Sequence, residues 1–303
     1  MPVRPPAPPP LAVTTEPYGS VVCVLAETAG SSLVRCQVWL GETRYRLRVL
    51  VTSVSAVKGI AIVTGGSRGI GAAVAVLLAQ SGWDVCLGYR RESDRAALVV
   101  ADCERTGRRA VAVQADVASE DDVLGLFAAA DRLGPVTALV NNAGIVDHQT
   151  RVDELTRARL DRMLAVNVVG PFLCAREAVR RMSTRHGGGG GVIVNLSSIA
   201  ATLGSPGEYV DYAASKGAVD TMTVGLAREV ADEGIRVNGV RPGLVDTEIH
   251  ASGGRPDRVE LMRGGVPMRR PGTADEVARA IAWLCSDEAS YVTGALLDVG
   301  GGR

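Results

Sequence analysis

The sequence has almost no lysine. Only Lys58 and Lys216 occur, so the other 31 of the 33 basic residues are arginine. The 33 acidic residues balance them, and the resulting formal charge of zero argues against a general polyanion-binding protein, so we expect no nucleic-acid partner. Because this chain otherwise relies on guanidinium for positive charge, a lysine at a given position suggests that the chemistry there needs an ammonium group.

Metal-binding and membrane patterns are missing as well. The six cysteines form no CxxC pair, and the three histidines show no HExxH spacing. We therefore expect no metal site, no disulfide framework and a reducing, cytoplasmic location. No apolar run approaches the roughly 20 residues that a spanning helix needs, which argues against membrane insertion. Since 47% of the side chains are apolar, the chain has enough hydrophobic residues for a large core.

Residues 1–57 differ from the rest of the chain. Seven prolines fall within residues 1–17, which favours an extended segment without a core. Apolar and polar residues alternate over 33–51, which favours a short β-hairpin that needs a packing surface to be ordered. We expect a poorly ordered extension here. The alternative is that the segment is not translated, because a start at Val54 immediately precedes the regular domain and a valine codon can serve as a start in bacteria.

From residue 58 to residue 303, short apolar runs with the length of buried strands alternate with longer segments of helical spacing. This alternation predicts a single α/β domain, with a doubly wound, seven-stranded parallel sheet and helices on both faces. The expected strands are 59–64, 83–88, 110–113, 137–141, 192–196, 235–240 and 295–298. The expected helices are 69–81, 92–106, 120–133, 153–183, 209–233 and 273–286.

A glycine-rich turn joins the first expected strand to the first expected helix. Its pattern is Thr-Gly-x-x-x-Gly-x-Gly, formed by Thr64, Gly65, Gly69 and Gly71. In a strand, turn and helix of this kind, backbone N–H groups and the helix dipole can meet a pyrophosphate. The spacing therefore predicts a nucleotide site.

Tyr212 and Lys216 lie four positions apart in a segment of helical pattern. This spacing puts both side chains on one helix face, with the ammonium a few ångströms from the phenol. A positive charge at that distance is expected to lower the pKa of the phenol from about 10 by roughly 3 units, which suits a proton donor and acceptor. The alternative is an ordinary surface pair, but one of only two lysines stands at this position.

The order of these motifs resembles that of the classical short-chain dehydrogenase/reductase family over residues 59–303. The glycine turn is followed in the same order by five further matches, which are Asn141-Asn142-Ala143-Gly144, Asn167, Ser197-Ser198, Tyr212-Ala-Ala-Ser-Lys216 and Arg241-Pro242-Gly243. The resemblance implies a Rossmann-type fold, an NAD(P) cofactor and transfer of hydride between a ketone or aldehyde and the matching alcohol.

The resemblance also implies a role for each matching residue. Catalysis is assigned to Ser198, Tyr212 and Lys216 with help from Asn167. Ser198 orients the substrate oxygen and is preferred to Ser197, although its distance from Tyr212 is one residue longer than the usual spacing. Asn167 either anchors a water for proton relay or only satisfies a backbone group. The cofactor is assigned to Gly65, Ser67, Arg68, Gly69, Ile70, Gly71, Tyr89, Arg90, Asp116, Val117, Asn142, Ala143, Gly144, Tyr212, Lys216, Pro242, Gly243, Val245 and Thr247.

Residues at the end of the second strand favour NADP over NAD. An NAD-dependent enzyme usually has an acid there, whereas this chain has Tyr89-Arg90-Arg91 and no carboxylate before Glu92. Arg68 and Arg90 can grip a 2′-phosphate, while Arg91 fits a plain surface position equally well.

Residues 248–270 are expected to form a lid over the substrate, and His148, Tyr209 and His250 to line the pocket beneath it. The substrate is expected to be a small carbonyl or alcohol compound. Two alternatives within the family are a sugar dehydrogenase and a 3-oxoacyl-carrier reductase, for which Arg255, Arg258, Arg263, Arg269 and Arg270 offer a basic docking surface. A dinucleotide-binding sensor or scaffold is the non-enzyme alternative. By resemblance we also expect a homotetramer or homodimer, formed through helices 153–183 and 209–233.

Overall fold

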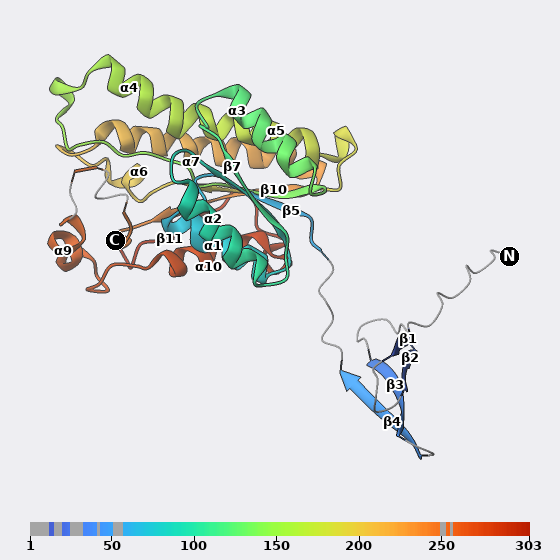
Figure 1. The fold of residues 1–303 in the computed structure, drawn as a ribbon. Coiled ribbons are helices and arrows are strands. Elements are labelled where there is room, and N and C mark those ends of the chain that lie inside the picture. Colours follow the sequence, from blue (N-terminus) through green and yellow to red (C-terminus); the bar gives the residue numbers. More distant parts are fainter. Residues whose placement is uncertain are drawn as a thin grey trace. The chain divides into compact units, whose positions relative to one another are not determined.

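A computed structural model describes residues 12–14, 20–24, 33–40, 43–50, 57–248, 253–254 and 257–303. The chain divides into two compact units, Met1–Ala56 and Val57–Arg303 (Figure 1).

The first unit contains a four-stranded antiparallel sheet in the order β1-β2-β3-β4. Its last two strands lie in the range where the sequence favours a hairpin, and they pair from Leu33 opposite Leu50 to Leu40 opposite Thr43. The first two strands were not expected, because three and five residues are too few for a clear alternating pattern. The strands are β1 (Ala12–Thr14), β2 (Ser20–Val24), β3 (Leu33–Leu40) and β4 (Thr43–Leu50).

The second unit confirms the predicted seven-stranded parallel sheet. The strand order is β11-β10-β9-β8-β5-β6-β7, so the direction of winding reverses at β5, between β8 and β6. Ligands of open α/β sheets bind outside the carboxyl ends of the strands at such a reversal. The strands are β5 (Ile60–Val63), β6 (Asp84–Tyr89), β7 (Ala110–Gln114), β8 (Val136–Asn141), β9 (Gly191–Leu196), β10 (Ile235–Pro242) and β11 (Leu296–Val299).

Helices cover both faces of this sheet (Figure 1). One apolar cluster packs helices α1, α2 and α10 against the sheet, and a second cluster packs α3, α5 and α7 against the other face. The main helices are α1 (Gly69–Gln80), α2 (Ser93–Glu104), α3 (Glu120–Asp131), α4 (Arg157–Leu164), α5 (Gly170–Met182), α7 (Val210–Val230) and α10 (Ala274–Cys285). Shorter segments are η1 (Val152–Glu154), η3 (Thr184–His186), α6 (Ala200–Leu203), η4 (Ala231–Glu233), α9 (Arg258–Met262), η5 (Arg263–Gly265) and η6 (Asp287–Ala289).

The prediction of a helix over 153–183 holds for 157–182, but the helix starts four residues later than expected and its middle turn is not α-helical. The structure has α4, then a π-helix, η2 (Ala165–Val169), and then α5. The hydroxyl of Thr156 accepts a hydrogen bond from the backbone N–H of Arg159, which starts α4 anew at residue 157. Pro171 has no N–H to donate to the carbonyl of Asn167 four positions earlier, and this favours the wider turn of η2. Within the part of the chain that the structure describes, no helix combines the length and apolarity needed to cross a bilayer.

Candidate active site

The glycine turn between β5 and α1 is held together by close backbone contacts. Gly65 and Gly69 have φ angles of +63° and +53°, a region that favours glycine. The side-chain amide of Asn142 donates hydrogen bonds to the carbonyls of Thr64 and Gly65 at 2.8 and 2.9 Å. The segment that follows β8 therefore fixes the shape of the turn that follows β5.

Gly71 was expected to contact the cofactor, but it does not line the cavity described below. It packs behind the turn, where a Cβ atom would lie 2.3 Å from the carbonyl oxygen of Gly65 and 2.4 Å from the amide nitrogen of Asn142. The third glycine of the motif thus allows the helix to approach the turn closely.

We expect Gly71→Ala to lower the free energy of unfolding by about 1–3 kcal/mol, because the added methyl group displaces the turn backbone. Gly225→Ala in α7 is the matched control, since a Cβ atom there meets no atom within 4 Å. That control should be neutral or stabilising by up to about 1 kcal/mol. Urea unfolding of both variants measures the difference, and equal stabilities would contradict the packing described here.

A cavity of about 950 Å³ lies at the carboxyl ends of the strands, beside the glycine turn. All the residues assigned above to catalysis or to the cofactor line it, except Gly71 and Asn167. Arg91, for which the sequence allowed a plain surface position, also lines it. Of the three residues expected beneath the lid, Tyr209 lines the cavity, His148 does not, and His250 lies outside the described residues. One cavity thus joins the expected nucleotide and substrate residues.

Tyr212 and Lys216 project into this cavity from the first turns of α7. The Lys216 ammonium nitrogen lies 5.7 Å from the centroid of the Tyr212 ring, and it donates a hydrogen bond to the carbonyl of Leu196 at 2.7 Å. The hydroxyl of Ser198 is hydrogen-bonded to the Tyr212 phenol. Ser197 is instead buried, and its hydroxyl donates to the backbone carbonyl of Lys216 at 3.2 Å. Ser198 is therefore the serine that faces the phenol.

Burial is the main cause of the pKa shifts of Tyr212 and Lys216. Removal from bulk water raises the pKa of Tyr212, and this outweighs the Ser198 hydrogen bond and the charge of Arg258, which both lower it. The sequence analysis expected a lowered phenol pKa. Burial also lowers the pKa of Lys216 to about 8, partly opposed by the negative charge of Asp220. At neutral pH the site therefore holds a protonated phenol beside an ammonium.

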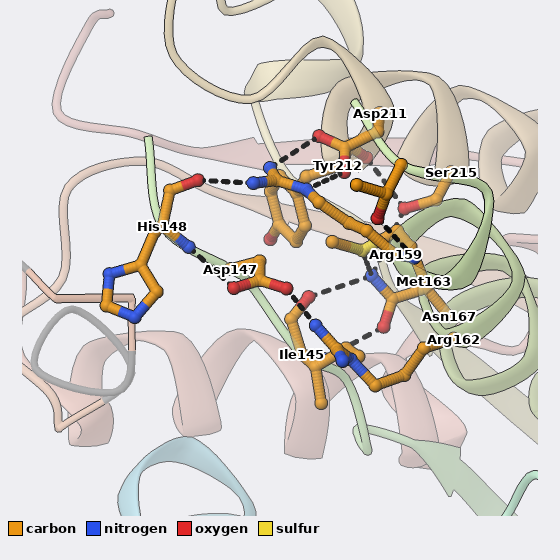
Figure 2. Close-up of polar contacts among 11 residues, drawn as sticks. Ile145, Asp147, His148, Arg159, Arg162, Met163, Asn167, Asp211, Tyr212 and Ser215 are labelled. Carbon is orange, nitrogen blue, oxygen red and sulfur yellow. Dashed lines mark hydrogen bonds and ion pairs between the residues drawn. The ribbon is translucent and has the colours of Figure 1, made fainter. Parts of the chain in front are cut away.

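Asn167 lies in the π-helix η2 and does not reach the cavity. Its amide oxygen accepts a hydrogen bond from the N–H of Ile145 at 2.8 Å, and its amide nitrogen donates to the carbonyl of Ile145 at 2.9 Å (Figure 2). The same nitrogen donates to the hydroxyl of Ser215 in α7 at 3.2 Å. Of the two interpretations left open above, these contacts favour the satisfaction of backbone groups over a water anchor.

An ion pair that the sequence analysis missed stands behind Tyr212. Arg159 of α4 and Asp211 of α7 form two hydrogen bonds, of 2.8 and 3.1 Å, and their side chains are only 10% and 1% exposed. Arg159 also donates to the backbone carbonyl of His148 at 2.6 Å (Figure 2). No pattern signals this pair, because the partners are 52 residues apart. It ties the residue before Tyr212 to α4 and to the loop after β8.

The arginines expected to grip a 2′-phosphate both lie beside carboxylates. Arg90 pairs with Asp116 at 2.8 Å, and Arg68 pairs with Glu92 at 3.3 Å. All four side chains are between 28% and 49% exposed, so these pairs are screened by solvent and easily exchanged for a ligand anion. Asp116 therefore both lines the cavity and forms an ion pair with Arg90.

Comparisons with known proteins agree with this geometry. The family model described as "Enoyl-(Acyl carrier protein) reductase" matches residues 65–303. The "Uncharacterized oxidoreductase YgfF" of Escherichia coli (strain K12) is 56% identical over 245 residues, which are 80% of this chain and 99% of that protein. The "3beta-hydroxysteroid dehydrogenase 1" of Eggerthella lenta is 41% identical over 80% of this chain and 92% of that protein. A crystal structure of a short-chain dehydrogenase from Burkholderia cenocepacia J2315 in complex with NADP is 37% identical, with a TM-score of 0.74, over 80% of this chain and 97% of that one.

Proposed function

The chain belongs to the classical short-chain dehydrogenase/reductase family, an NAD(P)-dependent oxidoreductase family, and on that premise we propose that residues 58–303 form an NADP-preferring enzyme that interconverts a ketone or aldehyde and the corresponding alcohol. The observation that carries the proposal is the convergence of Ser198, Tyr212 and Lys216 on the same cavity as the glycine turn.

The residues of the cavity fit a dinucleotide. Gly65 and Gly69 line the cavity with positive φ angles that favour glycine, and α1 starts at Gly69, so its N-terminal N–H groups suit a pyrophosphate. Arg68, Arg90 and Arg91 line the part of the cavity that follows the turn and β6. When bound, the nicotinamide supplies or accepts the hydride.

Residues of this chain transfer the proton and orient the substrate oxygen. In the reductive direction, the Tyr212 phenol donates its proton to the developing alkoxide, and a raised pKa keeps that proton in place at neutral pH. Ser198 donates a hydrogen bond to the same oxygen and so orients the carbonyl. The Lys216 ammonium stabilises the phenolate that remains, and it is itself held by the Leu196 carbonyl. In the oxidative direction Tyr212 takes the proton back.

The NADP preference is proposed from the arginines, and two solved relatives support it. These are the complex with NADP named above and a blue fluorescent protein from a metagenomic library in complex with NADPH, which is 38% identical with a TM-score of 0.74. We expect Arg90→Gln to raise KM for NADPH by about 10-fold or more, because a charge-assisted bond to phosphate is lost, and to leave KM for NADH nearly unchanged.

Arg95→Gln is the matched control for that variant. Arg95 has the same charge and pairs with Glu92 and Glu248, but it does not line the cavity. Steady-state kinetics gives KM for NADPH and for NADH in both variants. An equal rise in both KM values for Arg90→Gln would show that Arg90 does not select between the two cofactors.

A small-molecule substrate is favoured over an acyl-carrier protein. Three arginines proposed above as a docking surface are each paired with a glutamate, since Arg258 pairs with Glu208, Arg263 with Glu260 and Arg270 with Glu276. These carboxylates offset the positive charge that an acidic carrier needs. Arg255 lies outside the described residues.

The experiment that tests the function is a substrate panel assayed by nicotinamide absorbance, with NADPH and NADH side by side. The panel contains aldehydes, simple ketones, a ketosteroid, glucose, a 3-oxoacyl thioester and an enoyl thioester. Turnover of a carbonyl or alcohol member supports the proposal. NADP binding without turnover of any member supports the sensor or scaffold, and turnover of the enoyl thioester alone overturns the carbonyl chemistry.

We also propose self-association through the outer face of α4, η2 and α5. Leu164, Val169 and Phe172 on these elements are 47%, 46% and 51% exposed, which is unusual for large apolar side chains and suits a second copy of the chain. Sedimentation velocity distinguishes a dimer or tetramer from a monomer.

A reducing cytoplasm suits the described cysteines, Cys86, Cys103, Cys174 and Cys285, which are all free and buried.

A further inference from the structure

Arg258 lies in the short helix α9 of the expected lid, and its side chain turns back onto the segment just before α7. Its guanidinium forms an ion pair with Glu208 at 2.7 Å and stacks over the ring of Tyr209 at 4.9 Å from the centroid. The Arg258 side chain is only 14% exposed. All three residues line the same cavity as Tyr212.

The two contacted residues directly precede the helix that carries the phenol. Tyr209 is the N-cap residue of α7, and its carbonyl accepts the hydrogen bond of the Ala213 N–H at 2.9 Å. Holding Tyr209 therefore holds the first turn of α7, in which Tyr212 lies. The guanidinium is stacked on an aromatic face and bonded to a carboxylate, and lysine cannot reproduce this combination fully.

We propose that Arg258 is a positioning residue for the proton transfer: it fixes the Glu208–Tyr209 segment in front of α7 and places a positive charge on the cavity wall that faces the Tyr212 phenol. This inference rests on the proposed function for its catalytic meaning, but the electrostatic part concerns this chain alone. The charge of Arg258 is one of the two influences that lower the pKa of Tyr212 against the effect of burial.

Other charged groups line the same cavity as the phenol. Lys216 stands one turn later on α7, Glu208 partly neutralises Arg258, and Asp147 and Arg162, which pair with each other, line the cavity from the loop after β8 and from α4. Arg258 is the cation of this group that comes from the expected lid. Its replacement removes one positive charge from the cavity wall and leaves the side chains of Ser198, Tyr212 and Lys216 themselves unchanged.

The test compares Arg258→Gln, Arg258→Lys and Arg263→Gln. Arg263 is the matched control because it follows α9 directly, pairs with Glu260 at 2.9 Å and does not line the cavity. In the oxidative direction kcat/KM rises with pH as Tyr212 loses its proton. We expect Arg258→Gln to move the midpoint of this rise upward by about one pH unit, because a cation near the phenolate is lost. Arg258→Lys should move it less, and Arg263→Gln should leave it unchanged.

A second measurement needs no substrate. Ultraviolet difference titration of each protein against its Tyr212→Phe counterpart, with and without NADP⁺, follows the ionisation of Tyr212 itself. The same upward displacement is expected for Arg258→Gln. If the titration moves while no substrate of the panel is turned over, the proposed function fails and only the electrostatic part of the inference stands. A higher KM with an unmoved midpoint and an unmoved titration, in a variant that melts like the wild type, would show that Arg258 only shapes the lid and would overturn the inference.

Discussion

Replacing Tyr212 with phenylalanine is expected to lower kcat/KM by about 10²–10⁴-fold, the usual contribution of a positioned general acid or base. The phenol is the proposed proton donor. It is hydrogen-bonded to Ser198, and its ring centroid lies 5.7 Å from the ammonium nitrogen of Lys216. Phenylalanine keeps the ring and its packing and removes the hydroxyl group, and with it the transferable proton and the hydrogen bond with Ser198. The loss should therefore appear in kcat, with little change in the KM for the cofactor.

The control for this variant is Tyr291→Phe, because Tyr291 is fully exposed and does not line the cavity. It should behave as the wild type. NADPH fluorescence on binding to Tyr212→Phe checks that the nucleotide part of the site is intact. Wild-type turnover by Tyr212→Phe on any substrate of the panel would falsify the proton-transfer role.

Asp211→Asn is expected to lower the free energy of unfolding by about 3 kcal/mol. Its partner Arg159 has a side chain that is only 10% exposed, and the variant leaves this cation buried without a counter-charge. Because Asp211 directly precedes Tyr212, the variant is also expected to slow turnover. Urea unfolding gives the stability, and kcat at saturating cofactor gives the effect on the site.

Asp161→Asn is the matched control for the ion pair. Asp161 pairs with Arg157 four positions earlier at 2.7 Å, but these side chains are 56% and 86% exposed. Its removal should cost less than about 1 kcal/mol, since water screens the pair. The double variant Arg159→Met with Asp211→Asn should recover part of the stability, because no unpaired charge then remains buried. Equal losses for Asp211→Asn and Asp161→Asn would contradict the importance of burial.

The features that the sequence predicted correctly are those that depend on residues close together in the chain. The parallel sheet follows from strand-length apolar runs alternating with helical segments, and the pairing of Tyr212 with Lys216 follows from their spacing of four on one helix. The glycine turn has an equally local cause, because φ angles such as the +63° of Gly65 favour glycine.

Other features had no local signal. The start of α4 at Arg157 depends on Thr156, and the π-helical turn between α4 and α5 depends on Pro171, whereas the helical pattern alone favoured one regular helix. Asn167 lies in the expected region of the chain, but its role is set by the backbone of Ile145, 22 residues away. Arg159 and Arg258 appeared among many other arginines, and nothing in the sequence distinguishes them.

The sequence by itself therefore determined the α/β architecture, the glycine turn and the helical spacing of the phenol and the ammonium, because backbone conformation and short-range periodicity are properties of neighbouring residues. Only the tertiary structure decided which serine faces Tyr212, which arginines stand near it and in which direction its pKa moves. These depend on burial and on groups from distant parts of the chain. The removal of Tyr212 from water raises its pKa and outweighs the hydrogen bond of Ser198 and the charge of Arg258, which lower it.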